Sequence, residues 1–286
     1  MTQVSPNALR RLADNYRSSP QAAYRGRMSG TPKNVVQNAR VQEALDVWAD
    51  TKDPQTHSDV LRRAASGWLL LDISHSEFAD PDNPMQEGDK LALTSVSDGD
   101  GNDLLLAFTD NPRLEEFAGE GTVRSLAQRA SSVLAQAVSQ HDGLAIDAGT
   151  DGAFIAYSDE IRRAFGDDQD SATRLASAIV DGEHDLGQFV ALLRESVVYI
   201  GGIPVTGDDG DTVGYNIASA SRDDGSVLHA VFTSPAELWA WQPNAVAQPT
   251  TLDAIVLSAR QDEMVGLVVN PVGPAAEIPL EAFDAE

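Results

Sequence analysis

Leu104–Asp110 (LLLAFTD) returns 124 residues later in altered form as Leu228–Ser234 (LHAVFTS). Each stretch is a short apolar run that ends in Phe-Thr and is followed by a residue that caps helices well. A run of this length predicts a buried β-strand, and its ending predicts a helix that begins at once. We therefore expect the same strand-to-helix junction twice in this chain of 286 residues.

Two further blocks repeat in the same order around these junctions, which predicts an internal duplication. We expect two copies of one domain, at 57–166 and 172–286, behind an N-terminal arm of residues 1–56. The matching blocks are Gly143–Asp147 with Gly266–Asn270, Val60–Ala64 with Phe189–Leu193, and Trp68–Leu71 with Val197–Ile200.

The hydrophobic spacing predicts the same elements in each copy: an opening helix and strand, a β-hairpin, two helices, a buried strand and a short last strand. Ser234-Pro235-Ala236-Glu237 predicts a capped helix start. The fold class is thus α+β, with helices covering one face of a largely antiparallel sheet. The expected ranges are strands 68–73, 90–97, 103–108, 153–157, 197–205, 213–221, 226–232 and 276–280, and helices 123–139 and 251–260.

The charge is unevenly distributed along the chain, whose formal net charge is −24. Residues 1–40 carry seven basic side chains and one acidic, whereas the rest carries 13 basic and 43 acidic. The arm is expected to be partly helical, and to fold over the acidic body or to contact an anionic partner. The acidic domains themselves disfavour nucleic-acid binding.

No apolar run approaches the ~20 residues that span a bilayer, and the first 20 residues lack an export signal. A cytoplasmic protein is therefore expected. The chain has no cysteine, which excludes disulfides, thiolate metal sites and cysteine nucleophiles.

The repeated blocks resemble the N-terminal domain of SseB, a bacterial family named for enhanced serine sensitivity. The second copy is the closer match, through Phe232-Thr233-Ser234, Leu238, Trp241 and Val268-Val269-Asn270-Pro271. The first copy departs by carrying Asp147-Ala148 in place of Asn-Pro. The resemblance implies a tandem pair of SseB-like domains and supplies no catalytic residue, cofactor or activity.

The sequence predicts neither a catalytic residue nor a cofactor. Asp98–Asp103 imitates the start of a calcium loop but has Asp103 where that loop needs glycine, so a hairpin turn is the simpler interpretation. The five histidines lack zinc-ligand spacing, and no phosphate loop, dinucleotide motif or nucleophile elbow is present.

Four residues are candidates for binding. Thr109 and Thr233 either anchor the strand-to-helix junctions in the core or line a cleft at a helix start, where free amides attract anions. Trp239 and Trp241 lie two positions apart on one helix and point in different directions, so one could be core and the other an interface residue.

The sequence thus favours a non-enzymatic cytoplasmic protein that acts as a protein-interaction or regulatory module. The alternatives are a regulatory domain that binds a small ligand, such as an amino acid or another anion near Thr109 and Thr233, and an uncharacterised hydrolase that uses acidic residues.

Overall fold

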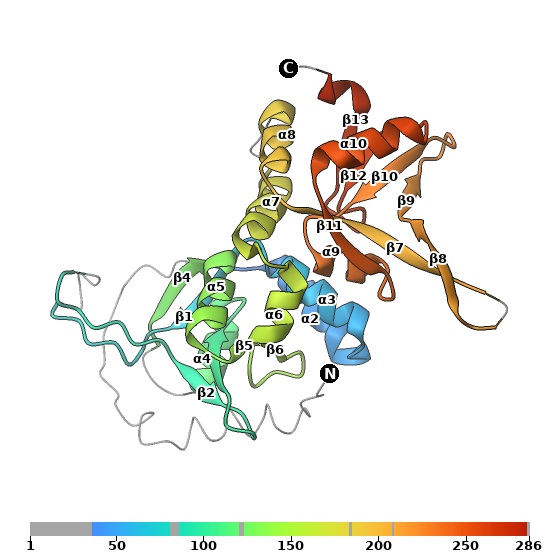
Figure 1. The fold of residues 1–286 in the computed structure, drawn as a ribbon. Helices are drawn as coiled ribbons and strands as arrows, with labels where there is room; N and C mark the ends of the chain where they lie inside the picture. Colours follow the sequence, from blue (N-terminus) through green and yellow to red (C-terminus); the bar gives the residue numbers. More distant parts are fainter. Residues whose placement is uncertain (1–35, 81–85, 120–122, 183–184, 208, 285–286) are drawn as a thin grey trace. The chain divides into compact units, whose positions relative to one another are not determined.

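The computed structural model divides the chain into two compact units (Figure 1). It describes residues 36–80, 86–119, 123–182, 185–207 and 209–284. Unit 1 is Gly67–Ile161 with the described part of Met1–Thr51, and unit 2 is Lys52–Ser66 with Arg162–Glu286. Most of the basic arm, which was expected to be partly helical, lies outside the described residues.

Unit 1 contains a four-stranded sheet in the order β2-β3-β5-β6, in which β3 and β5 are parallel and the other pairs antiparallel. Strands β1 and β4 form an antiparallel pair, and a bridge from Leu70 to Phe108 joins β1 to the end of β3. The elements are α2 (Ala39–Thr51), β1 (Trp68–Asp72), β2 (Ser95–Ser97), β3 (Asp103–Ala107), α4 (Asn111–Ala118), β4 (Ser125–Arg129), α5 (Ala130–Gln140), β5 (Gly143–Ile146), β6 (Phe154–Tyr157) and, across the unit boundary, α6 (Ser158–Phe165).

Unit 2 repeats this topology with the order β13-β12-β10-β9, and β10 and β12 are again parallel. The sheet β11-β7-β8 replaces the two-stranded pair, and the bridge from Tyr199 to Phe232 corresponds to that from Leu70 to Phe108. The elements are α3 (Pro54–Arg63), α7 (Gln169–Asp181), α8 (Leu186–Arg194), β7 (Val198–Thr206), β8 (Thr212–Ile217), β9 (Ser219–Ser221), β10 (Val227–Val231), α9 (Pro235–Trp241), β11 (Val246–Thr250), α10 (Leu252–Gln261), β12 (Gly266–Val269), β13 (Ala276–Pro279) and the 3-10 helix η2 (Leu280–Phe283).

The expected duplication and α+β class are confirmed by the equivalent strand pairings. Ala107 pairs with Ile146 in unit 1, and Val231 pairs with Val269 in unit 2. Apolar side chains of α8, α10 and η2 pack on one face of the second sheet. The short helix α9 contributes Leu238 to a second core cluster, which the expectation of helices on one face did not include.

Two strands were not predicted from the sequence. The prediction of a helix over 123–139 was wrong in its first part, because Ser125–Arg129 forms β4 and pairs with β1. Helix α5 begins only at Ala130. In unit 2, β11 contains Pro249, which lacks an amide hydrogen; β11 is an edge strand, where proline is tolerated.

Helix α3 is part of unit 2 although it precedes the first strand of unit 1. Asp53 and Thr56 form the capping box that starts it, and its Val60 and Leu61 are buried. The boundary predicted at 56/57 thus differs from the division into compact units, because α3 packs on α9. No described helix is both long and apolar enough to cross a bilayer.

Candidate functional site

The junction between β3 and α4 places a buried threonine beside a helix start. Asp110 caps α4 by accepting a hydrogen bond from the Arg113 amide at 2.9 Å, and proline follows in the first turn. Thr109 is fully buried immediately before the cap. This arrangement brings the first turn of α4 close to the end of the neighbouring parallel strand, β5.

Asp147 ends β5 and connects the two strand ends. Its carboxylate accepts hydrogen bonds from the Thr109 amide at 2.8 Å and the Thr109 hydroxyl at 2.5 Å. The Asp147 backbone is left-handed, with φ 49°, and its carbonyl accepts from the Thr150 amide to form a turn. Asp147 is therefore held by backbone as well as by side-chain contacts.

Arg113 supplies the positive charge at this position. Its Nε lies 3.2 Å from an Asp147 carboxylate oxygen, and its Nη1 lies 2.6 Å from Asp110. Burial raises the pKa of Asp147 to about 6, although the Thr109 hydrogen bonds and the Arg113 charge act in the opposite direction. The carboxylate is thus costly to ionise and already bound on both oxygens.

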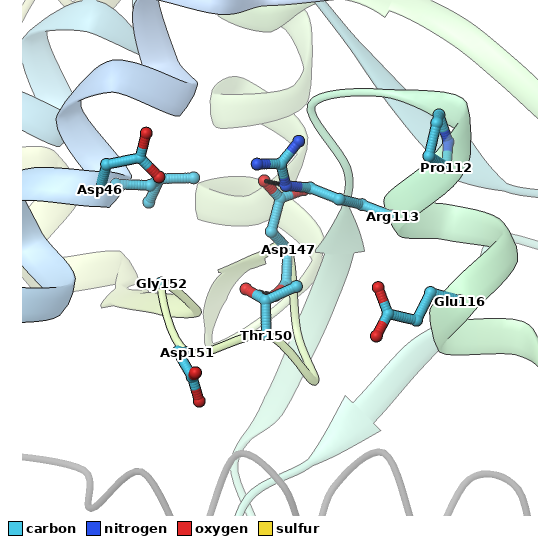
Figure 2. Close-up of a pocket in the computed structure, with 9 residues that line it drawn as sticks. Asp46, Pro112, Arg113, Glu116, Asp147, Thr150, Asp151 and Gly152 are labelled. Atoms are coloured by element: carbon cyan, nitrogen blue, oxygen red, sulfur yellow. Dashed lines mark hydrogen bonds and ion pairs between the residues drawn. The ribbon is translucent and has the colours of Figure 1, made fainter.

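A pocket of about 410 Å³ opens beside this cluster (Figure 2). Asp147 is its buried acid, and exposed acids come from α2, α4 and the turn that follows β5. The side chain of Gln42 holds α2 in place by donating to Asp110 at 2.7 Å and Thr109 at 3.2 Å. The lining residues are Leu45, Asp46, Pro112, Arg113, Glu116, Asp147, Thr150, Asp151 and Gly152.

Unit 2 builds the same junction with an amide in place of the carboxylate. Asn270 also has a left-handed backbone, with φ 55°, and its Oδ1 accepts from the Thr233 amide at 2.9 Å. Its Nδ2 donates to the Thr233 hydroxyl at 3.0 Å, so the threonine accepts where Thr109 donates. The junction geometry is therefore shared, but the threonine is bonded to a carboxylate in unit 1 and to an amide in unit 2.

Helix α3 supplies an arginine to the corresponding surface of unit 2. Glu237 takes the place of Arg113, and Gly273 that of Thr150 at the end of the turn. The guanidinium of Arg62 donates to the Gly273 carbonyl at 2.7 Å and lies 3.6 Å from Glu237. Its side chain is 2% exposed and also pairs with Asp59. In unit 2, this surface is thus contacted by a guanidinium from a helix that precedes residues 172–286 in the sequence.

The four residues that the sequence suggested for binding lie in the core or pack against it. Thr109 and Thr233 are buried, bonded to Asp147 and Asn270 respectively, and outside the pocket lining. Trp239 and Trp241 are both partly buried against the same core cluster, and the Trp239 indole donates to the Ala245 carbonyl. Their roles in binding stay predictions.

Sequence reasoning missed Arg113, Asp147 and Arg62 as candidate site residues. The contrast between Asp147 and Asn270 at the end of the repeated strand was the one available sign. Within the described residues, no group of His, Asp and Glu side chains is arranged to hold a metal ion. The calcium-like segment is a turn in which Asp98 accepts from the amides of Asp100 and Asn102.

The fold and junctions define a tandem α+β protein in which one domain occurs twice. The chain belongs to the SseB family: the SseB protein N-terminal domain matches residues 41–163 and again residues 172–282. The first match begins sixteen residues before the predicted start of the first copy, and it includes α3 and all but the first two residues of α2. No curated protein and no solved structure shows a significant match to the chain.

Proposed function

We propose that the chain is a non-enzymatic protein-interaction module of the bacterial cytoplasm. The observation that carries this proposal is that a helix packs on the same two segments of each SseB domain. These segments are the helix after β3 or β10 (α4 or α9) and the turn after β5 or β12. In unit 2, α3 binds there through Arg62 and through Gln55, which donates to the Ala240 carbonyl at 2.8 Å. In unit 1, Gln42 of α2 contacts Thr109 and Asp110, the N-cap of α4, and the Leu45 carbonyl of α2 lies beside Gly152 of the turn.

The bonding of Asp147 supports a binding role over a hydrolytic one. A general base must be free to take a proton from a substrate or water. Both oxygens of Asp147 are instead engaged by Thr109 and Arg113, which belong to the same fold. The pocket offers these groups as fixed charges for recognition.

A cross-linked pull-down with the full chain tests this proposal. We expect a partner whose cross-links map to α2, α4 and the turn after β5, and whose recovery falls at least tenfold with Asp46→Arg/Glu116→Arg. Asp209→Arg/Asp223→Arg changes the charge equally at exposed sites in unit 2 and should leave recovery unchanged. Equal recovery with both variants, or a hydrolytic activity abolished by Asp147→Asn, would overturn the proposal.

A second candidate is a regulatory domain that binds a small ligand. The pocket volume of about 410 Å³ falls in the ~300–1,000 Å³ range of small-molecule sites. A ligand at 100 times its dissociation constant would add ~2.7 kcal/mol to the free energy of unfolding. A thermal-shift screen of amino acids and small anions should then find a shift that Glu116→Arg removes, and a screen without shifts would exclude this role.

A further inference from the structure

The pocket of unit 1 has a strong excess of negative charge. Asp46, Glu116, Asp147 and Asp151 line it, and they come from α2, α4 and the turn after β5. Arg113 is the one basic lining residue, and its guanidinium contacts Asp110 and Asp147. Figure 2 shows the acidic side chains placed around the opening rather than on one element. This arrangement suits a cationic group that enters from outside.

Unit 2 shows how the same surface holds such a group. Arg62 reaches it from a helix that lies far away in sequence, and its planar guanidinium contacts a turn carbonyl and Glu237. The turns correspond: the Gly273 amide bonds to the Asn270 carbonyl as the Thr150 amide bonds to that of Asp147. Guanidinium groups make strong, oriented hydrogen bonds to carboxylates and carbonyls. Unit 1 has the same turn, and more acidic side chains surround it than in unit 2.

Residues 1–35 form a segment with a net positive charge. They carry five arginines, one lysine and a single acid, whereas the chain as a whole is strongly acidic. The described chain begins beside the pocket: Gln37 bridges to Asp110, one residue before α4, and the Asn38 amide donates to the Thr109 carbonyl at 2.9 Å. At ~3.3 Å per residue step, the chain from Arg27 to Val36 can span about 30 Å.

We infer that the pocket around Asp147 is a binding site for a basic side chain, occupied by an arginine or lysine of residues 25–33 of the same chain. This inference rests on the proposed interaction role of the surface and names its intramolecular occupant. A partner would then compete with the chain's own basic segment for the pocket.

Paramagnetic relaxation in the full chain tests the occupancy. The chain lacks cysteine, so Ser29→Cys provides a single site for a nitroxide label. We expect broadened amide signals for Thr150, Asp151 and Gly152, and loss of the broadening in Asp46→Asn/Glu116→Gln/Asp151→Asn. The matched control Asp209→Asn/Asp211→Asn/Asp223→Asn removes three exposed acids of unit 2 and should retain it.

A second variant leaves the pocket residues unchanged, so that its result does not depend on how a pocket variant folds. Arg25→Gln/Arg27→Gln/Lys33→Gln changes only the basic segment and should abolish the broadening as well. Absence of broadening in the labelled parent chain, or equal loss in the unit 2 control, would overturn the inference. If the pull-down captures a partner at the pocket but no broadening is seen, this inference alone is overturned. If broadening is seen but capture does not depend on the pocket, only the proposed function is contradicted.

Discussion

Asp147 and Asn270 are equivalent residues with the same left-handed backbone and the same threonine partner, and they differ in charge. The amide of Asn270 satisfies its threonine without any ionisation. The carboxylate of Asp147 needs Arg113 beside it, and burial still raises its pKa to about 6. Ionised Asp147 therefore costs unit 1 more folding free energy than neutral Asn270 costs unit 2, which is consistent with a role in binding rather than in folding.

Asp147→Asn, which copies the unit 2 residue, should stabilise the protein above pH 6. In the unfolded chain the carboxyl group of Asp147 has a pKa of ~3.9. The raised pKa in the folded state therefore lowers the free energy of unfolding as the pH increases from about 4 to 6, by about 3 kcal/mol in total. We expect the variant to gain roughly 1–3 kcal/mol at pH 7.5 and little at pH 4. Urea unfolding of both proteins at the two pH values measures the difference, and a variant less stable than the parent at pH 7.5 would contradict this account.

At the level of elements, α3 and α8 both precede the first strand of their copies, yet α3 packs on α9 whereas α8 packs with α10. The guanidinium of Arg62 on α3 is buried and pairs with Asp59 and Glu237. A buried ion pair contributes little net stability when complete, but removing one partner leaves an uncompensated charge. Helix α3 should therefore be sensitive to this single residue.

Arg62→Met is expected to destabilise unit 2 by ~3–5 kcal/mol, because Asp59 and Glu237 lose their shared cation. Arg63→Met offers a matched control on the same helix: its side chain also pairs with Asp59 but is 23% exposed, against 2% for that of Arg62. We expect a cost of about 1 kcal/mol or less there. Hydrogen exchange of α3 amides and urea unfolding distinguish the two, and equal costs would refute the assigned role of Arg62.

At the level of the whole molecule, the two units close separate cores around equivalent sheets. Gly143 and Gly266 begin the equivalent central strands β5 and β12. A Cβ at Gly143 would lie 2.5 Å from the Ala156 carbonyl oxygen, and one at Gly266 would lie 2.6 Å from that of Ile278. Each glycine therefore permits the close approach of the last strand in its own unit.

Gly143→Ala and Gly266→Ala should each destabilise one unit by ~1–3 kcal/mol, since the added methyl group meets backbone that cannot move freely. Hydrogen exchange should accelerate in β3, β5 and β6 for the first variant and in β10, β12 and β13 for the second. Gly99→Ala, where nothing lies within 4 Å of the added Cβ, is the control and should change neither unit. Uniform acceleration across both units would indicate that they do not unfold separately.

The sequence alone determined the duplication, the α+β class and most elements, because apolar spacing, caps and turn residues act over a few neighbouring positions. It predicted Thr109 and Thr233 as junction residues, and one of the two interpretations offered was an anchor in the core. Only the tertiary structure decided that Asp147 lies between Thr109 and Arg113, that Ser125–Arg129 is a strand, and that α3 belongs to unit 2. These features depend on partners 34 to more than 200 residues away, and local patterns carry no information about such pairings.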